Sequence, residues 1–239
     1  MSTALLLGIV AALAMMAGAL AVSSRAKLGL ALIDDVVCFS AGFMLALALS
    51  AAIPEALRVH PQRSALVVLL GYLLVHLSQH IIAPHFHFGQ ETHQVSELSS
   101  KAAVAGLGVH SFFDGVAIAS GFLVNPALGV LFFVAIALHK LPEGVAVSSL
   151  VLAAGGGVRA AYLAAGLLGV MTVLGVALTS RVALLTEYGL ALSAGVTIYV
   201  AASNLVPEFQ HQRTLRTALS FFAGAGVFVA TEWLLGRVM

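Results

Sequence analysis

The sequence contains few charged residues, and this scarcity limits the class of protein it can encode. Aspartate, glutamate, lysine and arginine make up 9% of the 239 residues, whereas 61% are hydrophobic and the mean hydropathy is +1.06. A soluble domain carries about 25% charged residues. Because too little polar surface is present to cover a water-exposed globule, we expect lipid to surround most of the chain. The formal net charge of +1 favours neither nucleic acid nor an acidic partner.

Cysteine and phosphate-binding loops are also scarce. Cys38 is the only cysteine, which excludes an intramolecular disulfide and a cysteine-based zinc site. No GxxxxGK[ST] sequence occurs, so this chain is not expected to hydrolyse ATP. The apolar run at 5–22 lacks a basic stretch before it and is followed by further apolar runs. We therefore interpret it as a retained membrane helix rather than a signal peptide.

Long apolar runs predict an all-α membrane protein with a single domain over residues 1–239. A helix that crosses the bilayer needs about 20 mainly apolar residues. Eight segments meet this requirement: 3–22, 33–54, 64–83, 102–123, 128–153, 160–180, 188–206 and 217–236. An even number of spans places both termini on one side, and the lysines and arginines of the loops favour the outside for them.

The second and seventh segments repeat one pattern. Both contain Ser-Ala-Gly, then a serine and then Pro-Glu at identical spacing, at 40–42, 50 and 54–55 in one and at 193–195, 203 and 207–208 in the other. With eight spans, these two segments cross the membrane in opposite directions. The pattern predicts inverted repeats that flank a central helix pair, an arrangement typical of transporters with a site near the midplane.

The fourth and fifth segments share a second pattern, H-x-x-x-[D/E]-G-V-A-[I/V], at 110–118 and 139–147. Residues four apart lie on the same face of a helix. His110 and Asp114 therefore share one face, and His139 and Glu143 share another, on helices that a short link makes antiparallel. Ionisable groups at mid-membrane depth are costly unless they are paired or bound. Four of them on neighbouring helices indicate a shared ligand, although a network that only joins the helices is the alternative.

Two imidazoles and two carboxylates suit a divalent metal ion. Zinc accepts such ligands in tetrahedral geometry, and Fe²⁺, Mn²⁺, Co²⁺ and Cd²⁺ would also fit. Pro142 leaves the carbonyl of Leu138 without its helical donor. Either that oxygen faces the ion, or Pro142 only kinks the membrane helix.

On these motifs the chain resembles the ZIP (Zrt-, Irt-like protein) metal transporters. The resemblance implies transport of zinc or a similar ion toward the cytoplasm, external termini and often a homodimer. We expect the protein to lie in the plasma (inner) membrane. By matching positions, the resemblance assigns the main transport site to His110, Asp114, His139 and Glu143, with Met44 approaching from the second helix. It places Glu55 and Glu208 near opposite mouths of the path, where each is otherwise an exposed helix-end charge.

The chain also departs from many members of that family, which bind a second ion beside the first. Where they carry asparagine, an acid or another ligand, and a glutamate, this sequence has Ser111, Lys140 and the Met171–Thr172 region. Lys140 lies three residues before Glu143, so its ammonium can reach that carboxylate. We therefore expect a single-metal site in which Lys140 is a built-in counter-ion. The alternative is a lysine whose side chain extends to the membrane interface.

Histidines gather after the third segment. His76 and His80 share a helix face at its end, and His85, His87 and His93 follow in the loop. The cluster predicts a weak, exchangeable metal-binding loop, whose substitution should change regulation or apparent affinity but not abolish transport. Solvated histidines without a ligand role are the alternative.

Two other functions use similar residues. An intramembrane zinc-dependent hydrolase would use Glu143 or Asp114 as the base for a metal-activated water. A metal sensor or scaffold would bind an ion without moving it. The inverted repeats favour a transporter over an enzyme, because only a transporter needs a site that is reached from both sides.

Overall fold

The computed structural model describes residues 2–23, 30–58, 61–79, 97–207 and 214–238, and these residues form helices and no strand. The elements in chain order are α1 (Thr3–Ser23), α2 (Leu30–Ala46), η1 (Leu47–Ala52), α3 (Ile53–Leu57), α4 (Pro61–Leu77), α5 (Glu97–Val124), α6 (Pro126–Ala153), α7 (Val158–Thr179), α8 (Ala183–Ile198), η3 (Tyr199–Leu205) and α10 (Leu215–Val238).

Among the described residues, seven helical stretches are long and apolar enough to cross a membrane. Two of them combine elements, since 34–57 runs through α2, η1 and α3, and 183–205 runs through α8 and η3. The helix α4 is apolar but shorter, with 17 residues. The predicted third span extends to 83, and its last residues lie outside the described ranges. The prediction of an all-α membrane protein is confirmed.

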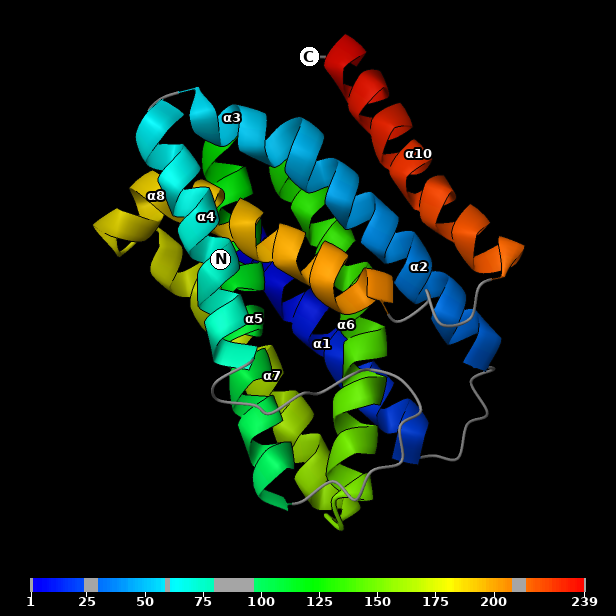
Figure 1. The fold of residues 1–239 in the computed structure, drawn as a ribbon. Coiled ribbons are helices and arrows are strands. Elements are labelled where there is room, and N and C mark those ends of the chain that lie inside the picture. Colours follow the sequence, from blue (N-terminus) through cyan, green and yellow to red (C-terminus); the bar gives the residue numbers. More distant parts are fainter. Residues whose placement is uncertain (1, 24–29, 59–60, 80–96, 208–213, 239) are drawn as a thin grey trace.

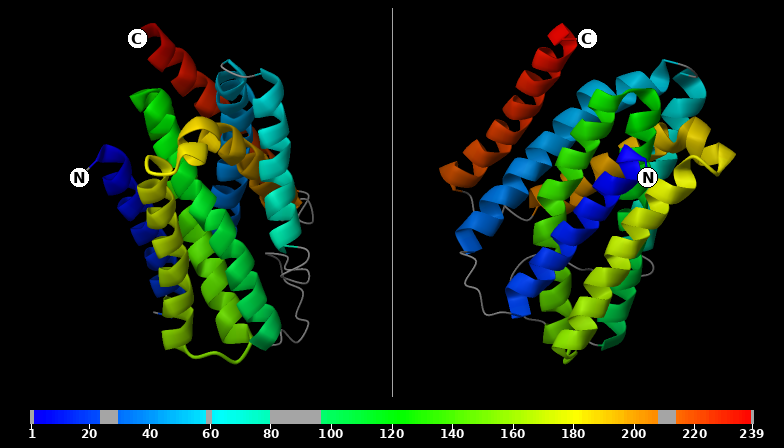
Figure 2. Two further views of the ribbon diagram at one scale, coloured as in Figure 1. Left: turned by 90° about the vertical axis from the view of Figure 1, so that its left-hand side faces the viewer. Right: turned by 180° about the vertical axis from the view of Figure 1, so that it is seen from behind.

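The helices form one bundle and two flanking pairs (Figures 1 and 2). The bundle consists of α1, α5, α6 and α7, which pack extensively on one another. Beside it, α2 packs on α10 and α4 packs on α8. The central helices α5 and α6 belong to the bundle and also contact the flanking helices α8 and α2, respectively.

Glycines let four pairs of helices approach closely, and these pairs reveal the inverted repeat. In each pair, a Cβ atom on either glycine would overlap a backbone carbonyl of the other helix, so only glycine allows the contact. The reciprocal contacts are Gly18 with Gly144, Gly115 with Gly175, Gly42 with Gly224, and Gly71 with Gly195. The α1–α6 pair thus corresponds to α7–α5, and the α2–α10 pair corresponds to α8–α4.

The repeated Pro-Glu segments share a further feature that the sequence pattern did not reveal. A π-helical segment interrupts each helix, and each segment ends two residues before the repeated proline, at Ala52 before Pro54 and at Leu205 before Pro207. Proline has no N–H to donate, so the i–4 carbonyl loses its usual partner and the helix rearranges locally. The matching position of both segments supports the relation between the two halves.

Candidate metal site

The candidate site lies on α5 and α6, which the single residue Asn125 joins. Pro126 is the first residue of α6, and the Asn125 side chain accepts a hydrogen bond from the backbone N–H of Leu128 at 2.8 Å, which caps the helix. Such a tight connection makes the two helices antiparallel neighbours, as Figure 1 shows. The repeated His-x-x-x-Asp/Glu motifs therefore face each other across the pair.

The structure brings all four residues of the predicted quartet together. One possible ligand atom from each of His110, Asp114, His139 and Glu143 lies within 4.8 Å of the others. Each residue is buried, with at most 4% of its surface exposed. Ionisable groups at this depth require compensation by partners or by a bound ion.

Asp114 is the hub of the quartet. Its Oδ2 atom lies 3.3 Å from Nε2 of His110, 3.4 Å from Nε2 of His139 and 2.7 Å from Nζ of Lys140. The two imidazole rings lie beside each other, with centroids 5.6 Å apart. One carboxylate oxygen therefore collects groups from both helices.

Backbone contacts orient one of the two histidines. Nδ1 of His139 lies 2.9 Å from the carbonyl oxygen of Ala135, one turn earlier in α6. Because a carbonyl only accepts, Nδ1 carries the proton in this contact, and Nε2 is the ring nitrogen that faces the quartet. Nδ1 of His110 has no hydrogen-bond partner in the part of the chain that the structure describes. A buried unsatisfied nitrogen of this kind is unusual away from binding sites.

Lys140 is completely buried and touches three oxygens. Its Nζ atom lies 2.7 Å from Asp114, 2.6 Å from Glu143 and 2.8 Å from Oγ of Ser111. Ser111 donates in turn to Oε1 of Glu143 at 3.3 Å. The alternative of a lysine that extends to the interface is wrong, since none of its surface is exposed. Sequence spacing indicated the contact with Glu143 but not the contact with Asp114 on the other helix.

Met44, Pro142 and Thr172 are the other residues near the quartet that the sequence singled out. Met44 is buried in the same hydrophobic cluster as Phe113 and Ala135, which are close in sequence to the quartet. The helix α6 continues through Pro142 without a break. Thr172 on α7 is buried, and its hydroxyl donates to the carbonyl of Leu168 at 3.3 Å. No carboxylate therefore stands at this place on α7.

Among the remaining candidates, only His76 and Glu55 lie within the described residues. The His76 ring on α4 packs against that of Tyr199 on η3, with centroids 5.7 Å apart. His80, His85, His87, His93 and Glu208 lie outside the described residues.

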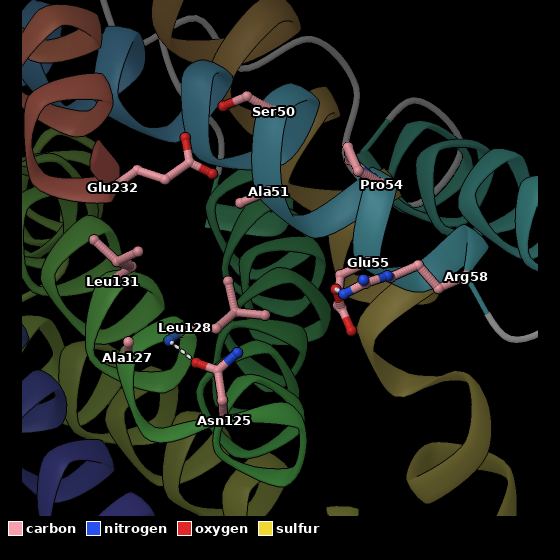
Figure 3. Close-up of a pocket in the computed structure, with 10 residues that line it drawn as sticks. All are labelled: Ser50, Ala51, Pro54, Glu55, Arg58, Asn125, Ala127, Leu128, Leu131 and Glu232. Carbon is pink, nitrogen blue, oxygen red and sulfur yellow. Dashed lines mark hydrogen bonds and ion pairs between the residues drawn. The ribbon is translucent and has the colours of Figure 1, made fainter. Parts of the chain in front are cut away.

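Glu55 belongs to a separate pocket of about 350 Å³ at the α3 end of the molecule (Figure 3). Its carboxylate pairs with Arg58 at 2.9 Å. Glu232, on α10, lines the same pocket together with Ser50 and Asn125. Sequence reasoning missed Glu232, although an acid within an apolar segment is a recognisable signal.

Comparisons with known proteins point to one family. The family described as ZIP Zinc transporter matches residues 89–232, which include both motifs of the quartet. Zinc transporter ZIP9-B of Xenopus laevis is 32% identical over 154 residues, 59% of this chain and 51% of that protein. Zinc transporter ZIP6 of Homo sapiens is 31% identical over 137 residues, 54% of this chain and 18% of that protein. The chain spans about half the length of the first curated relatives it matches.

Proposed function

Because the chain belongs to the ZIP zinc transporter family, we propose that it carries a divalent cation across the membrane through the quartet on α5 and α6. Zinc is the first candidate for the cargo, and the direction is toward the cytoplasm. The observation that carries this proposal is the burial of two imidazoles and two carboxylates, with ligand atoms within 4.8 Å, on the central helices of an inverted repeat.

The donor set supports zinc as the cargo. Nitrogen and oxygen ligands in a compact group of four match the tetrahedral sites that zinc prefers. Fe²⁺, Mn²⁺, Co²⁺ and Cd²⁺ accept the same donors, so competition among these ions would rank them. The quartet offers no thiolate, since the only cysteine, Cys38, lies on α2.

Lys140 supports a site for one ion rather than two. Its ammonium occupies the space between Asp114 and Glu143, with contacts of 2.7 Å and 2.6 Å. A second cation there would have to displace a buried positive charge that is already bound to both carboxylates. Lys140 is therefore the built-in counter-ion of a single-metal site, and Ser111 holds it in place.

The lysines and arginines of the loops favour an orientation of the protein in the membrane that puts the Glu55 pocket on the entry side. With the termini outside, α5 ends and α6 begins at the outer surface, beside Glu55 and Asn125. Glu208, at the opposite end of the repeat, belongs to the exit side. We assign the protein to the plasma (inner) membrane, where a homodimer is the expected assembly.

Two observations make a hydrolase a poor alternative. The family is one of transporters, and the relatives are named zinc transporters. A hydrolase also needs an open coordination position with an activated water, whereas Lys140 fills the space beside both carboxylates.

Transport is tested with purified protein in liposomes that contain a zinc-sensitive dye. We expect external zinc to enter vesicles with the wild-type protein, and His110→Ala and Glu143→Ala to abolish entry because each removes a ligand. Size-exclusion chromatography shows whether each variant is folded. If folded wild-type protein moves neither zinc nor any of the other four divalent ions, the proposed function is excluded.

A further inference from the structure

We infer that Lys140 keeps the net charge of the site equal in size with and without a bound ion, and that this balance lets the empty site complete the transport cycle. The inference rests on the proposed function. It assigns Lys140 a role in the return of the empty transporter, in addition to its place in a single-metal site.

The first observation is how completely the ammonium is bound. Lys140 has no exposed surface, and its three donors meet Asp114, Glu143 and Ser111 at 2.7, 2.6 and 2.8 Å. An ammonium has three protons to donate, so all three have acceptors. The positive charge is therefore a fixed part of the site, on the same carboxylates that an ion would use.

The second observation is the charge count. With neutral imidazoles, the two carboxylates and the ammonium leave one negative charge in the empty site, and a divalent ion turns this into one positive charge. With a neutral residue at position 140, the empty site would carry two negative charges and the loaded site none. The cost of holding charge in a low-dielectric interior rises with the square of the net charge.

This difference matters because a carrier moves through two steps, one loaded and one empty. With Lys140, the site has a net charge of the same magnitude in the loaded step and in the empty step. Without it, the loaded site becomes neutral and favoured, while the empty site becomes costly to bury. Lys140 also competes with the ion for Asp114 and Glu143, which favours release. A neutral residue should therefore tighten binding and slow the return of the empty protein.

Two liposome assays separate the steps. Net uptake into zinc-free vesicles requires the empty return, whereas exchange of radioactive zinc for unlabelled internal zinc uses only loaded steps. We expect Lys140→Gln to raise the ratio of exchange to net uptake about tenfold and to bind zinc more tightly, while Lys140→Arg stays near the wild-type ratio. Lys101→Gln, at an exposed position of α5, is the matched control and should keep the wild-type ratio.

A second variant tests charge independently of the loss of lysine. The double variant Ser111→Lys/Lys140→Ser moves the ammonium to the adjoining position, so it has the same net charges as the wild type in both states and keeps both carboxylates. Its ratio should return toward the wild-type value even if both rates are lower. An unchanged ratio in Lys140→Gln, or a double variant with the raised ratio, would overturn the inference. Wild-type protein that is inactive in both assays would instead contradict the proposed function.

Discussion

Asp114 and Glu143 are buried between α5 and α6, whereas Glu55 and Glu232 line a pocket at the α3 end of the molecule. The buried carboxylates contact two imidazoles and an ammonium, with Asp114 Oδ2 at the centre. In the pocket, Glu55 keeps 30% of its side-chain surface exposed, and its partner Arg58 keeps 74%. Two carboxylates are present in both places, but their surroundings differ completely.

The different surroundings suit the two sets of carboxylates to different tasks, tight binding of an ion and weak electrostatic attraction of cations. Charges in a buried site interact strongly and require fixed partners, so such a site can select an ion by its geometry. An exposed ion pair contributes little energy and is screened by salt. Acids around an open pocket raise the local concentration of cations without holding one tightly. We therefore propose that the quartet selects the ion and that the pocket attracts cations to its vicinity.

Removal of the hub should have the largest effect. Asp114→Asn keeps the shape of the side chain but removes the charge on the oxygen that meets both histidines and Lys140. We expect zinc uptake to fall at least about 100-fold, since loss of even an outer partner costs 10–100-fold in metal sites. The matched change in the pocket, Glu55→Gln, should retain most of the uptake. Equal losses in both variants would remove the distinction between the two places.

Close packing beside the quartet should matter more than packing at a glycine of α10 that faces open space. At Gly115, a Cβ atom would overlap the carbonyl of Thr172, so Gly115→Val should separate α5 from α7. We expect this variant to lose about 3 kcal/mol of stability and to lower the midpoint of thermal unfolding in detergent. Gly226→Val on α10 is the matched control, because in the described part of the chain no heavy atom beyond its own stretch of helix lies within 4 Å of its Cβ position. A similar shift for both variants would contradict the packing account.

The smallest effect is expected from the pocket itself. Glu55→Gln and Glu232→Gln together should raise the KM for zinc about threefold and leave the maximal rate unchanged, because they weaken attraction and not binding. The rise in KM should shrink at high salt. Glu187→Gln, at an exposed position on α8, should change neither value. Complete loss of uptake would show that the pocket carries an essential ligand.

Sequence spacing was sufficient to find the quartet. Residues four apart share a helix face, and the short link at Asn125 makes α5 and α6 antiparallel neighbours, so the sequence predicted that the four side chains would lie close together. The apolar runs likewise predicted the helices, because bilayer thickness fixes their length. The matched Ser-Ala-Gly and Pro-Glu patterns pointed to the inverted repeat before the reciprocal glycine contacts revealed it.

Individual contacts between side chains on different helices could not be predicted from residue spacing along the sequence. The ion pair of Lys140 with Asp114 depends on the rotation and axial register of α6 against α5, which spacing within one helix does not define. Glu232 is isolated in the sequence and lines the same pocket as Glu55 only because α10 packs beside α2. The π-helical segments depend on local hydrogen bonding near Pro54 and Pro207, for which proline alone is an incomplete signal.

X-ray absorption at the zinc edge of the loaded protein tests the central claim most directly. The account predicts one zinc per chain with a first shell of nitrogen and oxygen at about 2.0–2.2 Å and a clear imidazole contribution. In the double variant His110→Ala/His139→Ala, that imidazole contribution should disappear. An unchanged imidazole signal in the variant would contradict the account, because it would place the ion on other histidines.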